Sequence, residues 1–375
     1  MRVLKKLQEK EGLIISKNWK PKEHSEIKEK ILGKYLFPWF MKVSSGFKNV
    51  FYIDTCSGPG IYKNGFKGSP IIALEQAYKA WKKHERTTFH FRFIDKDNSD
   101  CKELENNIRN LTINDDGFDN NDFNDFMNSI KYECINEDYS AVLDNLIFEV
   151  NELRAASFTF IDPYNATTVP MKHIIRFMDF DRSEVLYNFM LSDLVRTRKN
   201  RTLADTTEIF GEAIDISVMT DEQISNTYEK CLKKRIENSY VLKYIMRHSE
   251  KRMRLYDLYH LTHHKEGLKI MKGIMRGLST SNHYFSNDKR YNKEQLSIFI
   301  PGLDEFRHHL CKEFDRKEVK LEEILERFVM NDEFLWDGKV IGDFLVKLRN
   351  DDEVEFVPNR KRPIKSTIIK IKYSA

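Results

Sequence analysis

The feature that most constrains the fold is a regular alternation of strand-like and helix-like segments. Apolar, β-rich runs occur at Val50–Thr55, Thr88–Asp95, Lys131–Asn136, Ser157–Asp162 and Glu184–Met190. Segments of helical period lie between them, at Pro70–His84, Asn98–Leu111, Ser140–Leu153 and Met171–Phe177. Strands that alternate with helices are joined by right-handed crossovers into a mostly parallel sheet covered on both faces. The sequence therefore predicts an α/β, Rossmann-like doubly wound domain.

The alternation occupies residues 49–280 and is interrupted by insertions. Asn114–Asp125 is acidic and Asn-rich, which is typical of a surface loop. Residues 195–248 have helical periodicity and predict a helical insertion, after which Arg254–Leu261 is expected as a sixth strand. Upstream, residues 1–48 carry an amphipathic helix that we expect to form an N-terminal helical lid.

The pattern changes toward the C-terminus, in residues 293–375. Val319–Phe328 and Lys339–Leu348 predict two short helices, and Glu353–Val357 and Thr367–Tyr373 predict two strands around a basic loop. Helices followed by a two-stranded ribbon with a basic tip indicate a winged-helix-like domain.

Composition sets the class of protein but not its function. The chain has 375 residues, a net charge of +4 and five cysteines without metal-site or disulfide-framework spacing. Residues 1–12 are charged rather than apolar, and no apolar run approaches the ~20 residues of a membrane-spanning helix. We expect a soluble, cytoplasmic protein with reduced thiols and no membrane association.

Polar residues and glycines follow the first predicted strand. The segment Asp54-Thr-Cys56-Ser-Gly58-Pro-Gly60 would let the backbone approach a ligand beyond the carboxyl end of the strand. An ordinary turn explains a lone Gly-Pro-Gly equally well.

Acids follow the next three strands as well. The second strand ends at Asp95, with Asp97 as a competitor for the ribose hydroxyls of a nucleoside. The third ends before Asp138, and the fourth at Asp162. Any one of these could be a solvated loop acid or a helix N-cap, but four in succession at one sheet edge favour a nucleoside site.

These residues resemble the class I S-adenosylmethionine (SAM)-dependent methyltransferase pattern. The resemblance implies SAM as cofactor and a set of cofactor-binding residues: Asp54, Cys56, Gly58, Gly60, Asp95 and Asp138. The segment Asp162-Pro163-Tyr164-Asn165 is similar to the Asp-Pro-Pro-Tyr motif of amino-group methyltransferases, with its second proline absent. In that motif the polar side chain orients an amine and the aromatic ring stacks on the base, so these four are the candidate catalytic residues.

A longer resemblance is to the three-Cys-motif partner protein family. It is carried by Asp54-x-x-Ser-Gly-Pro-Gly, Gly68-Ser69-Pro70-Ile-Ile-Ala-Leu, Phe160-Ile-Asp-Pro-Tyr-Asn165 and Leu186-Tyr-Asn-Phe-Met190. The resemblance implies a methyltransferase-like domain and a partner of the radical-SAM-like type that bears three cysteines.

Other motifs have simpler explanations. Ser69-Pro70 predicts a helix N-cap followed by proline in the first turn. His260-x-x-His263-His264 lacks a third ligand at recognisable spacing, so we predict no metal site. Cys56 lacks a Pro-Cys context, which favours a small buried thiol.

The C-terminal basic residues form the concentrated positive patch of the sequence. They are Lys347, Arg349, Arg360, Lys361, Arg362 and Lys365. On a winged helix they would contact phosphates, whereas neutralisation by Asp351, Asp352, Glu353 and Glu355 would leave a protein-contact surface.

Two functions follow as expectations. The first is a SAM-dependent methyltransferase that acts on nucleic acid, and the second is an accessory, substrate-recognising partner of a radical-SAM-like protein. A nicotinamide or nucleotide cofactor is a third possibility, but the glycine spacing does not match G-x-G-x-x-G.

Overall fold

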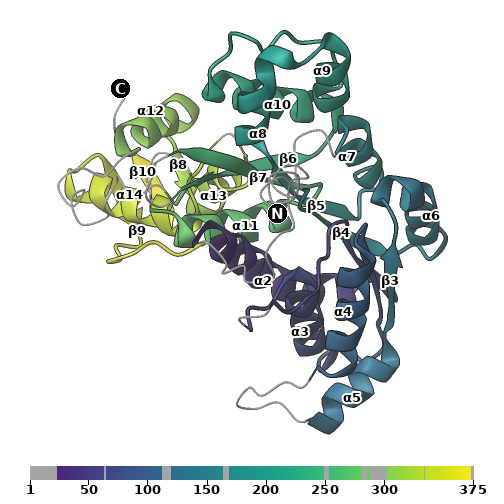
Figure 1. Ribbon diagram of the computed structural model, residues 1–375. Helices are drawn as coiled ribbons and strands as arrows, with labels where there is room; N and C mark the ends of the chain where they lie inside the picture. Colours follow the sequence, from purple (N-terminus) through teal and green to yellow (C-terminus); the bar gives the residue numbers. More distant parts are fainter. Residues whose placement is uncertain are drawn as a thin grey trace.

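The computed structural model describes residues 23–62, 65–111, 120–163, 169–248, 253–280, 285–287, 302–332 and 334–372. They form a larger α/β domain and a smaller C-terminal domain beside it (Figure 1). Within these ranges, no helix combines the length and apolar character needed to cross a bilayer. All five cysteines are described, and no disulfide joins them.

The larger domain is built on a seven-stranded sheet with the order β3-β2-β1-β4-β5-β7-β6. Its strands are β1 (Asn49–Asp54), β2 (Thr88–Asp95), β3 (Lys131–Asn136), β4 (Ala156–Ile161), β5 (Ser183–Phe189), β6 (Tyr240–Arg247) and β7 (Arg254–Thr262). Strands β1 to β5 are parallel, and β7 is antiparallel to both of its neighbours. The winding direction reverses between β1 and β4, where such sheets open a crevice at their carboxyl edge. This topology confirms the predicted Rossmann-like doubly wound sheet of the class I methyltransferase type.

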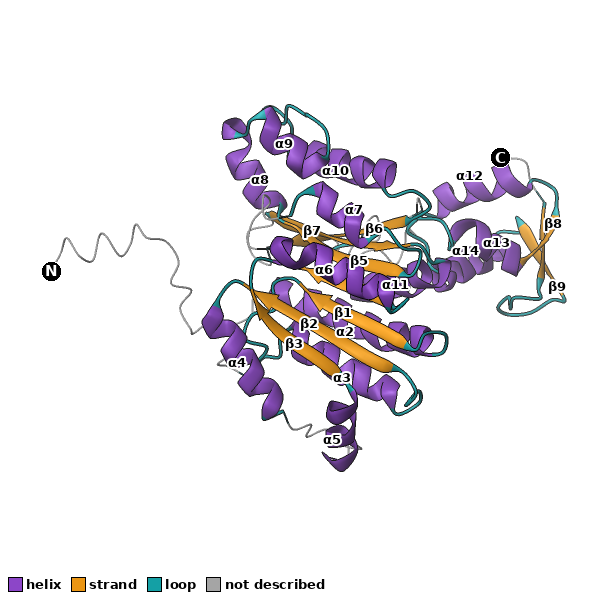
Figure 2. Cartoon of the chain, turned by 90° about the vertical axis from the view of Figure 1, so that its right-hand side faces the viewer, coloured by secondary structure: helices purple, strands orange, loops and turns teal. Residues whose placement is uncertain are grey.

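The sheet separates two apolar cores, because side chains of a strand alternate between its faces. In β1, Val50 and Tyr52 belong to one core, and Phe51 and Ile53 to the other. The first core is covered by α2 (Glu23–Ser44), α3 (Ser69–Trp81), α4 (Asn98–Arg109), α5 (Asn120–Ser129) and α11 (Lys265–Leu278). The second is covered by α6 (Tyr139–Glu152), α7 (Met171–Phe177), α8 (Leu191–Thr197), α9 (Leu203–Phe210) and α10 (Asp221–Arg235), with a short 3-10 turn at Arg198–Asn200. Figure 2 shows the strands, in orange, between these helices.

Helix α2 packs across the first face and brings its N-terminal turns to the carboxyl edge of the sheet. It contacts α3, α11 and β1, and its apolar stripe is fully buried. The Tyr35 hydroxyl donates to Glu184 Oε2 at 2.5 Å, and His260 Nε2 lies 3.0 Å from the same oxygen. His260 is therefore part of a buried network that pins α2 to β5 and β7, and the described residues hold no group of three or more candidate metal ligands.

Three sequence-based expectations about secondary structure were wrong. Residues 195–248, predicted as a helical insertion, are helical only in part, because the apolar run at 240–247 forms β6 and pairs with β7. The strand predicted as the sixth is therefore the seventh strand, β7. Residues 120–125 begin α5 instead of forming a loop, because Phe123 and Phe126 pack on Tyr78. The rest of that predicted loop, 114–119, lies outside the described residues.

The C-terminal domain has its own apolar core. Its helices are α12 (Leu303–Phe314), α13 (Leu321–Phe328) and α14 (Gly338–Asn350), and its antiparallel sheet has the order β8-β10-β9. The strands are β8 (Glu318–Lys320), β9 (Val354–Val357) and β10 (Ile368–Ile371). The sequence did not predict α12 or β8, but this order of helices and ribbon is compatible with the predicted winged-helix-like domain.

The two domains are joined by buried polar contacts from α11. Lys272 is fully buried, and its ammonium donates to the carbonyl oxygens of Val329 at 2.7 Å and Asn331 at 2.6 Å, just beyond the end of α13. The Arg276 guanidinium donates to the Leu335 carbonyl at 2.8 Å. From the other side, Asp332 accepts from the Val241 amide at 3.0 Å. The C-terminal domain is thus held at the β6–β7 side of the sheet (Figure 1).

Candidate cofactor site at the carboxyl edge

The glycine loop after β1 is anchored by the acid at the end of β2. Gly58 and Gly60 have φ values of 58° and 74°, a left-handed conformation that favours glycine. The Gly58 amide donates to Asp95 Oδ2 at 2.9 Å, and Asp95 Oδ1 accepts from the Asp97 amide at 2.9 Å. A Cβ on Gly60 would lie 2.5 Å from Leu104 Cδ1. Asp95, which is buried, therefore fixes the loop, whereas Asp97 is exposed and caps α4.

The helix that follows the loop starts one residue earlier than its sequence suggests. Gly68 is the N-cap of α3, with Pro70 in the first turn, so the prediction that Ser69 caps the helix was wrong. The Ser69 hydroxyl instead hydrogen-bonds the Asp54 carboxyl, and the Gly68 amide donates to the Gly60 carbonyl at 2.6 Å. The first turn of α3 is thereby tied to the end of β1.

Asp54 lies fully buried at the end of β1. It accepts hydrogen bonds from the Cys56 amide and from the Tyr52 hydroxyl, both at 3.3 Å. Burial raises the pKa of Asp54 to about 7, although these donors oppose the shift. Burial also raises the pKa of the Cys56 thiol, although Cys56 is half-buried and not the buried thiol that the sequence predicted.

Asp162, at the end of β4, is held by two side chains that sequence reasoning missed. Lys28 of α2 forms an ion pair with Asp162 Oδ2, and the Asn188 amide of β5 donates to Oδ1 at 2.6 Å. The Lys28 ammonium also lies 5.8 Å from the centre of the Phe160 ring. Burial opposes the charge of Lys28, but Asp162, Tyr256 and Glu29 together outweigh burial and raise the pKa of the ammonium.

One signal in the sequence could have indicated Lys28. It precedes Ile31, Leu32 and Tyr35 by three, four and seven residues, which places it on the buried stripe of α2. A charged residue on such a stripe requires a partner, because an unpaired buried charge is costly. Asn188 stands in an apolar strand and carries no comparable signal.

Glu29, the next residue of α2, adds a third carboxyl group to those of Asp54 and Asp162 near the ends of β1 and β4. Burial raises the pKa of Glu29 to about 8; Lys28 opposes this shift, and Asp162 and Asp54 add to it. Within the described part of the chain, buried Glu29 Oε2 and Asn188 Oδ1 have no hydrogen-bond partner. The carboxyl edge therefore holds buried polar atoms without partners, and the Ser57 hydroxyl in the loop after β1 is another.

The remaining predicted residues are placed as follows. Asp138 caps α6 by accepting from the Ser140 amide at 2.8 Å, and it forms an ion pair with Lys96 at 2.6 Å. Asp138, predicted as a cofactor-binding residue, therefore acts in this structure as the N-cap of α6. Pro163 follows Asp162 at the end of β4, while Tyr164 and Asn165 lie outside the described residues.

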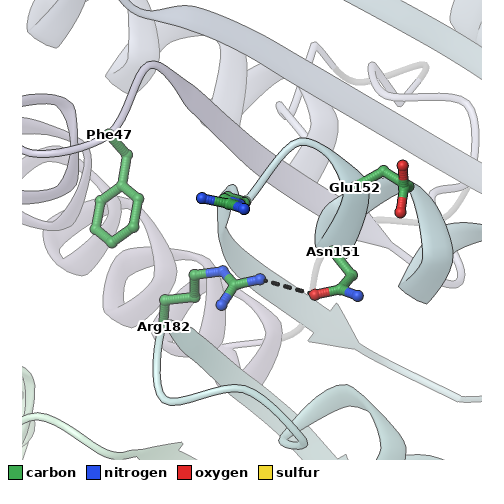
Figure 3. A pocket seen from close by; sticks show the side chains of 5 residues that line it. Phe47, Asn151, Glu152 and Arg182 are labelled. Atoms are coloured by element: carbon green, nitrogen blue, oxygen red, sulfur yellow. Dashed lines mark hydrogen bonds between the residues drawn. The ribbon is translucent and has the colours of Figure 1, made fainter.

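A hollow of about 530 Å³ lies at the opposite, amino edge of the sheet, which no sequence motif indicated (Figure 3). It is lined by Phe47, Asn151, Glu152, Arg154 and Arg182. The Arg182 guanidinium is already engaged by the Ala155 carbonyl at 2.7 Å and by Asn151 Oδ1 at 3.2 Å. The hollow is thus separate from the carboxyl-edge acids.

The basic loop between β9 and β10 is partly neutralised, by acids other than those expected. Arg362 pairs with Asp343 of α14 at 2.7 Å, and Lys365 pairs with Glu322 of α13 at 3.6 Å. Of the acids expected to neutralise the basic residues, Asp351 does pair with Lys347 at 2.9 Å, whereas Glu353 pairs with Arg307 at 2.7 Å and Asp352 with Lys372 at 2.6 Å. Arg349 donates to the Arg360 carbonyl and shapes the loop.

Comparison with known proteins places this chain in no family. No family model and no curated protein matches it. Among solved structures, 21 chains match. One is a Legionella pneumophila protein described with the family name DUF519, at 13% identity over 68% of this chain and 92% of that chain, with a TM-score of 0.39. Another is loganic acid methyltransferase with SAH, at 9% identity over 96% of this chain and 98% of that chain, with a TM-score of 0.26. Both TM-scores are too low to assign an activity, and the resemblance to three-Cys-motif partner proteins stays a prediction.

Proposed function

We propose that this chain is a methyltransferase-like protein that binds SAM in the crevice between β1 and β4. The observation that carries the proposal is the Asp95-anchored glycine loop at the point where the sheet reverses its winding, since nucleosides bind at such switch points. Gly58 and Gly60 would let the backbone approach the ligand closely, and the carboxyl groups of Asp54 and Asp95 would supply acceptors. When bound, SAM supplies a methyl group activated by its sulfonium.

Replacing Asp95 by alanine is expected to weaken SAM binding at least tenfold, because the Gly58 amide loses the carboxylate that fixes the loop. Calorimetric titration with SAM and with S-adenosylhomocysteine (SAH) measures this effect. Asp97→Ala is the matched control, because Asp97 is exposed and caps α4 two residues away. Equal loss in both variants would contradict the role of Asp95, and no binding by the wild-type chain would contradict the cofactor.

For the acceptor, we propose nucleic acid docked on the basic loop of the C-terminal domain. Within the described residues, the exposed Arg360 and Lys361 side chains have neither a hydrogen-bond nor an ion-pair partner, so they are open to phosphates. Arg362 and Lys365 could exchange their exposed carboxylate partners for phosphates, since such surface pairs contribute little energy.

Changing Arg360 and Lys361 together to alanine is expected to lower affinity for double-stranded DNA and to reduce the slope of log K against log salt by about two. Fluorescence anisotropy at several salt concentrations measures both quantities, with single-stranded DNA and RNA as further probes. Lys199→Ala with Lys230→Ala is the matched control, because both lysines are exposed on the other domain. Equal slopes for the two double variants would argue against this surface.

The contacts of Asp162 favour a second candidate function. An acid that orients an acceptor amine does so best when no cation neutralises it, but Asp162 is already paired with Lys28, and Asn188 binds its other oxygen. This arrangement favours an accessory role, in which the domain recognises a substrate and presents it to a radical-SAM-like partner. Co-purification of such a partner, together with no methyl transfer by the isolated chain, distinguishes this role from catalysis.

A further inference from the structure

We infer that Glu29 is a selectivity residue of the carboxyl-edge site, whose carboxylate favours a ligand with a positive charge at its reacting atom. In chemical terms, it selects the sulfonium of SAM over the neutral thioether of SAH. The inference rests on the proposed function and adds to it a residue outside the sheet, supplied by α2.

The first support is the balance of charge around Glu29. The ionisable groups that interact with it, or share its surroundings, are Lys28 on α2, Tyr52 and Asp54 on β1, Tyr62 after β1, Asp162 after β4 and Tyr256 on β7. Lys28 is the cation of this set, and it is already committed to Asp162. Among the described residues, the carboxyl groups of Glu29 and Asp54 thus share a buried region with no cation besides Lys28.

The second support is independent of charge and concerns hydrogen bonding. Asn188 is 3% exposed, and its amide donates to Asp162 while its Oδ1 has no donor within the described residues. Glu29 Oε2 is also buried and has no hydrogen-bond donor within the described residues. Asn188 contacts Asp162, and Glu29 interacts electrostatically with the same carboxylate. Buried acceptors are normally satisfied, so these two unsatisfied oxygens indicate a site for a donor or a cation.

Without a ligand, protonation of Glu29 and Asp54 lowers the free-energy cost of burying their carboxyl groups. Burial holds the pKa of Glu29 at about 8 and that of Asp54 at about 7. A cation that enters stabilises the carboxylate forms, so binding at neutral pH must release protons. A ligand without this positive charge stabilises the carboxylates less and therefore releases fewer protons.

The test is calorimetry of SAM and SAH at about pH 7 in two buffers that differ in ionisation enthalpy, which yields the number of protons released. We expect about one proton more for SAM than for SAH. In Glu29→Gln most of this difference should be lost, because only Asp54 remains to release a proton, and the preference for SAM over SAH should fall about tenfold. Glu26→Gln is the matched control, because Glu26 lies on the same helix with its side chain 44% exposed. Thermal unfolding of each variant confirms that it is folded.

The outcomes separate the inference from the function on which it rests. Equal proton release for SAM and SAH by the wild-type chain would overturn the inference without any variant and leave the cofactor in place. An unchanged SAM preference in Glu29→Gln would do the same. Failure of both ligands to bind would overturn the proposed cofactor, and the role of Glu29 with it.

Discussion

Exchanging Lys28 for methionine should destabilise the folded protein by about 3 kcal/mol at neutral pH, because it leaves the Asp162 carboxylate beside Glu29 and Asp54 without its cation. Methionine retains most of the volume of the lysine stem, so lost packing contributes little. Urea unfolding at about pH 7 measures the free energy difference.

The neighbouring exposed lysine provides the control for this prediction. Lys30 lies two residues further along α2, with its side chain 57% exposed, and it pairs with Glu26 at 3.6 Å. Lys30→Met should change the free energy of unfolding by less than about 1 kcal/mol. Similar losses in the two variants would mean that helix propensity or surface charge, and not the ion pair with Asp162, explains the effect.

Substitution of the adjacent residue, Glu29, should change the free energy of unfolding in the opposite direction. Glu29→Gln is expected to stabilise the protein by roughly 4 to 5 kcal/mol at about pH 8.5 and to have almost no effect at about pH 4. The folded-state pKa of Glu29 is raised from 4.5 to about 8, so the folded protein holds this proton more tightly than the unfolded chain does. Below the unfolded pKa both states are protonated, and the penalty develops between about pH 4.5 and about pH 8.

Unfolding curves of the wild type and Glu29→Gln across this pH range measure the predicted divergence. Glu26→Gln should remain parallel to the wild type, because Glu26 is exposed. A constant difference at every pH would show that the titration of Glu29 is not its cause. Stabilisation together with lost SAM preference would identify a residue retained for binding at a cost in stability.

The sequence predicted the sheet well because its signals are local. The apolar runs of β1 to β5 and the helical segments between them match the structure closely, and they fix the parallel topology through handedness rules. β6 was missed because Tyr240–Arg247 follows a strongly helical, charged segment, and its pairing with β7 is a tertiary event.

The candidate site was predictable only in the part that belongs to the sheet. Asp54, Gly58, Gly60, Asp95 and Asp162 each follow a strand, so the topology alone brings them to one edge. Lys28 is 134 residues from Asp162 in the chain, and no local pattern records that separation. The sheet could be derived from periodicity, whereas the contribution of α2 required three-dimensional packing.

The docking of the C-terminal domain has a consequence for any target that both domains contact. Lys272, whose pKa burial lowers to about 7, holds the end of α13 through two carbonyl oxygens, and Arg276 holds Leu335 beside it. These contacts fix the position of the C-terminal domain relative to the sheet. If the basic loop binds a nucleic acid strand as proposed, the fold would fix the number of nucleotides between the bound phosphates and the nucleotide that reaches the crevice.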